Sequence, residues 1–277
     1  MGTTLRQELL ATAPRVVEAV SDISGVVCAS LGGSVGAGLG DAMSDLDIHV
    51  FWEAPLAEQG QRTARLTAIA DPSTVRVGIN SWGLEDHLKL EGRLVELIYF
   101  HWADVRADVD RAYSEGLVSN GFTTAVMYSV AHGVPLFDPT GELGAVRERL
   151  NSEFPEATRI ALLRRETPLL EFHVKQLRRA QARGDVVFAQ HVRYKVQASF
   201  FDLLFTLNRH YHPGEKRLTE HSLRCPIRPH ECEARWNRAA CLPSDDPALA
   251  DELDALATEL RNLARAHGGV EIPDEPL

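Results

Sequence analysis

The chain has 277 residues, of which 44% are hydrophobic, so it is long enough for one large domain or two small ones. Its formal net charge of −10 argues against nonspecific nucleic-acid binding, which normally needs a basic surface. Residues 1–20 carry charges and lack the apolar run of a signal peptide, and no stretch reaches the roughly 18 apolar residues of a membrane span. We therefore expect a cytoplasmic monomer or homodimer with reduced cysteines.

Helix and strand patterns alternate in the first 120 residues. Apolar residues at helical spacing predict a helix over residues 4–20, which Pro14 can split or restart. Short runs rich in β-branched and aromatic residues predict strands at 25–31, 46–52, 74–80 and 93–100. Helices are predicted at 56–70 and 104–114. The pattern indicates an α/β (α+β) domain with a short mixed sheet.

The strand signal disappears from about residue 120 onward. Residues 135–150 read as a connector, and Thr167 with Pro168 predicts a helix start, as N-cap and first helical residue. Helices are predicted over 121–133, 167–183, 186–211 and 249–263. We therefore expect a boundary between a first domain, 1–142, and an all-helical second domain, 143–277.

Asp45 and Asp47 stand out because they flank the start of a strand that otherwise reads as buried. Residues i and i+2 of a strand project from the same face, with a rise of about 3.3 Å per residue, so the two carboxylates can converge. Two carboxylates side by side repel unless a cation neutralises them. A hard divalent ion such as Mg²⁺, which usually also takes phosphate oxygens as ligands, is the expected partner.

A glycine-rich turn comes directly before this strand. Gly33, Gly36 and Gly38 let the backbone adopt positive φ and approach a ligand closely. Amides in such a turn can hold phosphate oxygens, and Ser34 adds a hydroxyl donor. A phosphate-binding turn beside paired carboxylates is typical of phosphoryl or nucleotidyl transfer.

These residues together resemble the signature of the DNA polymerase β-like nucleotidyltransferase superfamily, closest to the antibiotic (kanamycin- and lincosamide-type) and minimal nucleotidyltransferases. The matching residues are Gly33, Ser34, Gly38, Ser44, Asp45 and Asp47. Ala37 is a departure, because many relatives have a basic residue there. The resemblance implies two Mg²⁺ ions held by Asp45 and Asp47, with ATP or another NTP as co-substrate.

The superfamily also has a third carboxylate on a later strand, and Glu96 fits it because this residue stands among apolar neighbours in residues 94–100. Its expected role is to bind the ion nearer the acceptor or to take the acceptor's proton. Glu91 and Asp86 are weaker candidates, because we place them in the turn before that strand. His49 shares a face with Asp47, and a packed or supporting histidine is the favoured interpretation.

Residues 200–218 resemble, more loosely, the substrate-domain segment of these enzymes, where a helix ends at a Pro-Gly turn and a lysine. The resemblance implies that Lys216 reaches the nucleotide phosphates and that Asn208 and Tyr211 line the same cleft. The alternative for Lys216 is a solvated cation near a helix end.

A cysteine-rich segment near the C-terminus raises the question of structural zinc. The possible ligands are Cys225, His230, Cys232 and Cys241. Their spacing fits no common zinc motif, in which ligands come as close pairs, so a zinc site is disfavoured.

The resemblance implies a nucleotidyltransferase with a catalytic domain at 1–142 and a substrate-binding domain at 143–277. It would move an NMP, AMP from ATP first of all, to a hydroxyl of a small acceptor such as an aminoglycoside- or lincosamide-like antibiotic. A toxin-type enzyme acting on tRNA or protein is an alternative, and it would need a basic surface, which residues 164–183 offer. An inactive nucleotide-binding regulatory module is another alternative, against which the intact Ser34, Asp45 and Asp47 argue.

Overall fold

The computed structural model describes residues 2–41, 44–53, 55–80 and 83–275. The elements before residue 153 are α1 (Gly2–Ser21), β1 (Val26–Leu31), α2 (Gly33–Gly36), β2 (Leu46–Trp52), α3 (Gln59–Thr67), the 3₁₀ turn η1 (Pro72–Thr74), β3 (Arg76–Asn80), β4 (Gly83–Leu90), β5 (Arg93–His101), α4 (Trp102–Ser114), α5 (Ala125–His132), β6 (Val134–Phe137) and α6 (Glu142–Ser152). The later elements are α7 (Glu156–Ala182), α8 (Val186–Leu207), α9 (Leu218–Ser222), α10 (Cys232–Ala240) and α11 (Pro247–His267).

The N-terminal elements form a mixed six-stranded sheet with strand order β3-β4-β5-β2-β1-β6. The β2–β5 pair is parallel, and the other neighbouring strands are antiparallel. A mostly helical C-terminal region follows the sheet. The predicted fold class is therefore confirmed.

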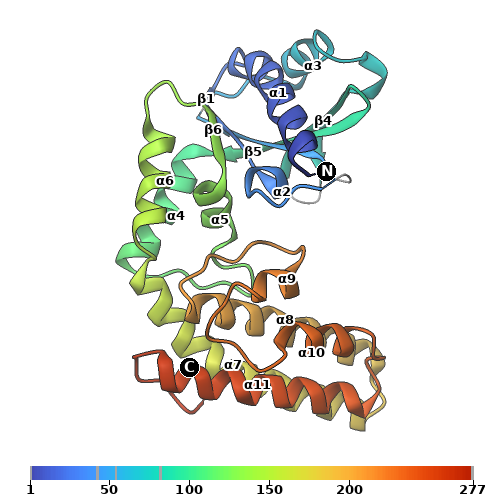
Figure 1. Ribbon diagram of the computed structural model, residues 1–277, viewed down its shortest axis with the longest axis vertical. Helices are drawn as coiled ribbons and strands as arrows, with labels where there is room; N and C mark the ends of the chain where they lie inside the picture. The colour runs from blue at the N-terminus through green and yellow to red at the C-terminus, as the bar shows by residue number, and fades with distance from the viewer. Residues whose placement is uncertain (1, 42–43, 54, 81–82, 276–277) are drawn as a thin grey trace. The chain divides into compact units, whose positions relative to one another are not determined.

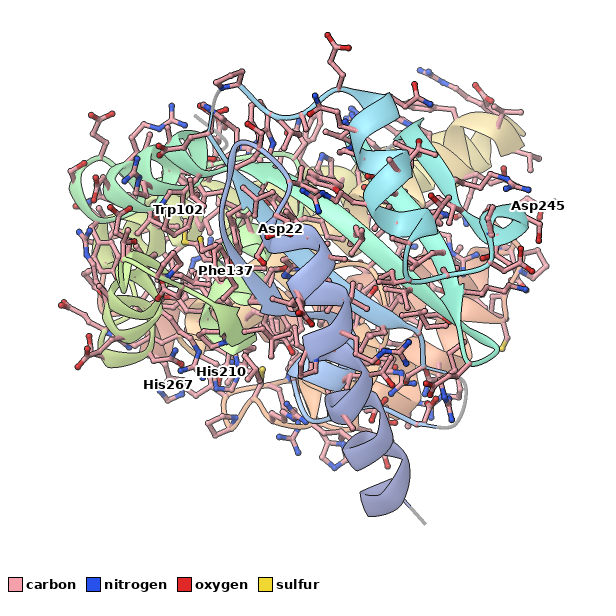
Figure 2. The ribbon with its side chains drawn as sticks, turned by 90° about the horizontal axis from the view of Figure 1, so that it is seen from above. Asp22, Trp102, Phe137, His210, Asp245 and His267 are labelled. Atoms are coloured by element: carbon pink, nitrogen blue, oxygen red, sulfur yellow. The ribbon has the colours of Figure 1, made fainter. Side chains whose placement is uncertain are left out.

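Side chains alternate between the two faces of this sheet, and one face is covered by α1 and α3 (Figure 1). The covered face is apolar because every second residue of the central strands is buried there, as are four residues of α1: Ala13, Val16, Val17, Val20, Leu46, Ile48, Val50, Val95, Leu97 and Tyr99. Asp22, labelled in Figure 2, follows α1 and accepts a hydrogen bond from Arg65 of α3 at 3.1 Å. The alternation leaves the odd-numbered residues of β2, Asp47 among them, on the opposite face.

Two compact units divide the chain: residues 1–109 with 129–153, and residues 110–128 with 154–277. In the second unit α7, α8 and α11 pack side by side (Figure 1). Their apolar faces form its core, in which Phe200 and Phe201 of α8 contact Trp236 of α10. None of the helices in the described residues has both the length and the apolar character that a membrane crossing requires. The predicted division at residue 142 stays a prediction.

Several predicted elements differ from the structure. Residues 83–90 form β4 and residues 134–137 form β6, although no strand was predicted at either place. The predicted connector also contains α6. Pro168 does not begin a helix but lies inside α7, which starts at Glu156, and Thr167 is buried with its hydroxyl donating to the Leu163 carbonyl at 2.7 Å. The helix predicted to reach residue 211 ends at Leu207.

Candidate functional site

The predicted glycine turn follows β1, includes the short helix α2 and lies against β2. Gly33 and Gly38 have positive φ as expected, whereas Gly36 does not. The Gly32 amide donates to the Asp47 carbonyl at 2.8 Å, which extends the β1–β2 pairing by one residue. Gly33 has φ +55, and a Cβ on Gly33 would overlap Oδ2 of Asp47. Glycine is therefore required at position 33 both by the backbone conformation and by the Asp47 carboxylate packed against it.

Serine side chains tie this turn to the start of β2. The Ser34 hydroxyl donates to Ser44 Oγ at 3.0 Å, and Ser44 Oγ lies 3.3 Å from Asp41 Oδ1 and accepts from the Asp41 amide at 2.8 Å. Residues 42 and 43 of the same loop are outside the described residues. The connected hydroxyls hold α2 and the residue before Asp45 in one local arrangement.

Three predicted metal ligands come from two neighbouring strands. Asp45 precedes β2, Asp47 lies within β2, and Asp47 pairs with Glu96 of β5 in the parallel register. All three residues are half-buried. The side chains of Asp45 and Glu96 have no hydrogen-bond or ion-pair partner within the described part of the chain. Oxygen donors without a protein partner fit a hard divalent ion such as Mg²⁺.

Asp47 and Glu96 begin a row of polar side chains that continues onto β4, which the sequence analysis did not identify as a strand. His87 of β4 pairs with Glu96 in the antiparallel register, so His87, Glu96 and Asp47 follow one another across three strands on one face. Glu85, two residues before His87, shares that face, and its carboxylate lies 2.7 Å from His87 Nε2. The run Glu85-Asp86-His87 was the signal available in the sequence.

Asp86, by contrast, points to the covered face, as its pairing with Leu97 requires. It is fully buried and receives two hydrogen bonds from Arg62 of α3, at 2.9 and 3.3 Å, and one from the Gly78 amide. Arg62 also lies over the Tyr99 ring, and burial, with the neighbouring Asp86, raises the pKa of Tyr99. Asp86 therefore lies in a strand and not in the expected turn, and it belongs to a buried ion pair. Glu91 does lie in the turn, with φ +53, and pairs with Arg15.

His49 packs beneath the glycine turn. A Cβ on Gly32 would overlap the His49 ring, and this ring makes an edge contact with Phe100 at 5.5 Å between centroids. Burial lowers the pKa of His49 to about 4, so the imidazole is neutral at physiological pH. These contacts agree with the interpretation of His49 as a packed residue that supports the turn.

In the helical unit, Asn208 and Tyr211 have contacts of their own. The Asn208 side chain bridges the end of α8 to residue 227, because its amide donates to the Leu204 and Ile227 carbonyls and its oxygen accepts from the Ile227 amide. Tyr211 is buried and stacks on Phe154 at 5.0 Å. Lys216 is exposed.

The cysteines do not gather into a metal site within the described residues. Cys225 and Cys232 are buried, whereas His230 and Cys241 are exposed. Burial raises the pKa of Cys225 to about 12 and that of Cys232 to about 11, so both thiols are neutral at physiological pH.

A buried pair of carboxylates lies in the helical unit. Asp202 of α8 accepts from the Thr123 amide at 3.3 Å and the Thr123 hydroxyl at 3.1 Å, and Glu166 of α7 contacts Arg165 at 3.1 Å. Burial, together with the negative charge of Glu166, raises the pKa of Asp202 to about 7. Neutralisation of Asp202 by a proton is therefore part of the stability of this unit.

Comparisons with known proteins give a family-model match over the middle of the chain and distant structural likenesses. Residues 121–218 match the family described as a domain of unknown function (DUF4037). The matched range includes Asn208, Tyr211 and Lys216 but not the carboxylates of β2 and β5. No curated protein matches the chain. Among solved structures, the chain is similar to a nucleotidyltransferase-like protein from Exiguobacterium sibiricum 255-15, with 14% identity, a TM-score of 0.40, and coverage of 91% of this chain and 72% of that one.

Proposed function

We propose that the chain is an Mg²⁺-dependent nucleotidyltransferase that moves a nucleoside monophosphate, first of all AMP from ATP, onto a hydroxyl of a small acceptor. The observation that carries this proposal is the cross-strand pair Asp47 and Glu96 beside the glycine turn, because Asp47 Oδ2 occupies the space above Gly33. Paired carboxylates next to a glycine-rich turn suit the binding of a metal-bound phosphate chain.

Asp45 and Asp47 would hold both ions, and Glu96 would join them in holding the ion nearer the acceptor. Mg²⁺ at these positions would neutralise the phosphate charge and stabilise the attacking and leaving oxygens. Gly33, Ser34 and Ser44 would hold the β- and γ-phosphates, whereas the Gly38 amide already donates to the Val35 carbonyl at 3.1 Å. The acceptor oxygen forms a bond to the α-phosphorus, the bond to the β-phosphate oxygen breaks, pyrophosphate leaves, and the acceptor proton passes to a carboxylate such as Glu96.

A cationic acceptor such as an aminoglycoside is the first choice, since the chain carries 39 acidic against 29 basic residues. The toxin-type alternative receives less support from residues 164–183, because many of the cations there already have partners. Lys175 pairs with Glu171, Arg178 pairs with Asp251 and Asp254, and Arg165 contacts Glu166 and the Ser119 carbonyl.

The test is transfer from each labelled NTP, with Mg²⁺ and a panel of hydroxylated acceptors, followed by pyrophosphate release. Asp47→Asn should abolish transfer and leave the fold intact, because the amide keeps the shape and removes the charge. Asp104→Asn is the matched control, since this exposed carboxylate pairs with His101 outside the row. Pyrophosphate release at the wild-type rate by folded Asp47→Asn protein would contradict the assignment.

A further inference from the structure

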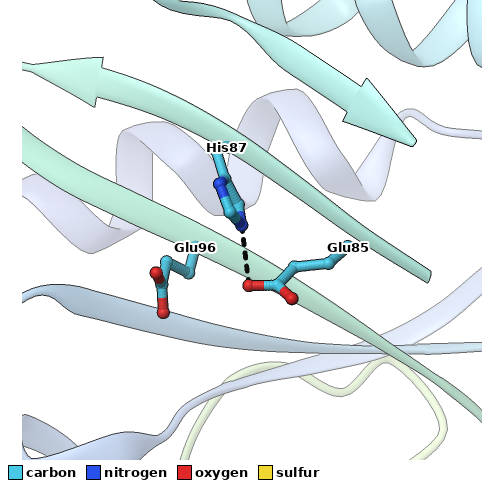
Figure 3. A group of neighbouring side chains, drawn as sticks. All are labelled: Glu85, His87 and Glu96. Carbon is cyan, nitrogen blue, oxygen red and sulfur yellow. Dashed lines mark hydrogen bonds and ion pairs between the residues drawn. The ribbon is translucent and has the colours of Figure 1, made fainter. Parts of the chain in front are cut away.

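Glu85, His87 and Glu96 form a cluster of three possible metal ligands on the face of the sheet opposite α1 and α3 (Figure 3). Each offers one donor atom, and the three donor atoms lie within 4.8 Å of one another. It is the one group of three or more such residues found within the described parts of the chain. The cluster therefore differs from a scatter of exposed acidic groups.

The sheet register brings these residues together. β4 and β5 form a tight antiparallel hairpin in which His87 pairs with Glu96 and Glu85 pairs with Ile98. Directly paired residues project from the same face, and so do residues two apart in one strand. The imidazole and both carboxylates are therefore held on one face by backbone hydrogen bonds, and Asp47 is the next residue in the row.

The charges in this cluster are not balanced by basic side chains. The Glu96 carboxylate has no side-chain partner among the described residues, and Glu85 pairs with His87. The Glu85 side chain is only 10% exposed, so its charge is largely withdrawn from water. Asp86, which lies between Glu85 and His87 in the chain but on the other face of the sheet, has the buried Arg62 as its counter-ion. A cation between Glu85 and Glu96 would supply the missing charge.

The donor types indicate which cations fit. One imidazole nitrogen with two carboxylate oxygens suits Mn²⁺, Zn²⁺ and similar transition metals, whereas Mg²⁺ strongly prefers oxygen ligands alone. We propose that Glu85, His87 and Glu96 bind a divalent transition-metal ion, with Mn²⁺ or Zn²⁺ as the expected class. Bonds from both side chains to the ion would then replace the 2.7 Å hydrogen bond between Glu85 and His87.

This assignment deepens the proposed function, because Glu96 is also the carboxylate proposed to act on the acceptor side. The role of the bound metal in transfer therefore rests on the proposed function. The assignment adds Glu85 and His87, which the superfamily resemblance did not supply, and replaces Mg²⁺ by a transition-metal ion at the Glu96 position, whereas Mg²⁺ stays the ion expected at Asp45 and Asp47. Metal binding in the absence of nucleotide can be measured independently of transfer, so the two proposals can fail separately.

The experiment uses the full chain with Mn²⁺ alone. Titration followed by electron paramagnetic resonance gives the affinity, and electron spin-echo modulation detects a nitrogen nucleus bound to the ion. The wild type should bind Mn²⁺ and show nitrogen modulation. His87→Gln should lose that modulation and bind Mn²⁺ about 100-fold more weakly or worse, since even supporting residues of metal sites contribute 10–100-fold.

Two controls match the test variants. His101→Gln removes a histidine of the neighbouring strand β5 with similar side-chain exposure, 32% against 35% for His87 of β4, and should keep the nitrogen signal. Glu91→Gln removes an exposed carboxylate of the same hairpin and should leave the affinity unchanged, whereas Glu85→Gln should weaken it. Absence of nitrogen modulation in folded wild type, or its persistence in His87→Gln, would overturn the proposal. Nucleotide transfer in such a protein would still leave the proposed function standing.

Discussion

Gly33→Ala is the substitution that most sharply separates backbone strain from damage to the site. Gly33 has φ +55, a conformation that costs an L-residue such as alanine about 1–2 kcal/mol. The added methyl group would also overlap Oδ2 of Asp47. Gly141→Ala is the control, because Gly141 has φ +76 in the same compact unit and nothing lies within 4 Å of its added Cβ.

The two effects differ in size and in what they change. Backbone strain of about 1–2 kcal/mol should lower Tm by roughly 2–8 °C in both variants, at about 2–4 °C per kcal/mol for a chain of this size. In Gly33→Ala the carboxylate must also move by about 1 Å or more, and a misplacement of about 1 Å costs on the order of 10²-fold in rate. Transfer by Gly33→Ala should therefore fall about 100-fold beyond any change in Gly141→Ala.

Thermal melting followed by fluorescence and single-turnover transfer from α-labelled ATP measure the two effects on the same preparations. Equal transfer rates in Gly33→Ala and Gly141→Ala would refute the reasoning, because the Asp47 position would then have no part in the reaction. A much larger loss of Tm in Gly33→Ala with normal transfer would likewise assign the contact to stability.

Three further predictions concern Glu96, Asp202 and Arg62. Glu96→Gln should leave Mg–ATP binding nearly intact, as measured by calorimetry with a non-hydrolysable analogue. The rate of single-turnover transfer should fall about 10²–10⁴-fold. Weak nucleotide binding by a folded variant would count against an acceptor-side role for Glu96. The pKa of Asp202 is raised from 3.8 to about 7, so its stabilising contribution is complete below about pH 4 and is lost as the pH rises through 7. Denaturant unfolding at different pH values should show that Asp202→Asn removes this loss of unfolding free energy, which is on the order of 4 kcal/mol at most. Parallel pH profiles of unfolding free energy in the two proteins would exclude this contribution of Asp202. Arg62→Met should destabilise the protein by about 3–5 kcal/mol because it leaves Asp86 buried without its counter-ion, whereas the additional change Asp86→Leu should recover much of that loss.

The glycine turn and the acidic strand could be predicted because their signals are local. The i, i+2 spacing of Asp45 and Asp47 and the three glycines before them define the turn and the strand without any knowledge of distant residues. Glu96 could also be selected, since a carboxylate among apolar strand residues is costly without a partner. Its place beside Asp47 depends on the parallel β2–β5 register, which the structure supplies.

The remaining differences arise where long-range packing decides the structure. β4 has a mixed pattern because Asp86 faces the covered side and is balanced by Arg62, so a charged residue stands where alternation predicts an apolar one. This concealed the strand and with it the position of His87. Pro168 resembled a helix start, but α7 continues through it, and Pro168 is buried together with Thr167 and Leu170 of the same helix.

The central claim is that the chain transfers the α-phosphoryl group of a nucleotide together with its nucleoside. The most direct measurement compares α- and γ-labelled ATP in the presence of Mg²⁺ and a hydroxylated acceptor that supports turnover. We predict that the α-label becomes attached to the acceptor while the γ-label leaves in pyrophosphate, and that Asp47→Asn abolishes both. Attachment of the γ-label to the acceptor, or its release as inorganic phosphate with no α-label transferred, would contradict the proposed function.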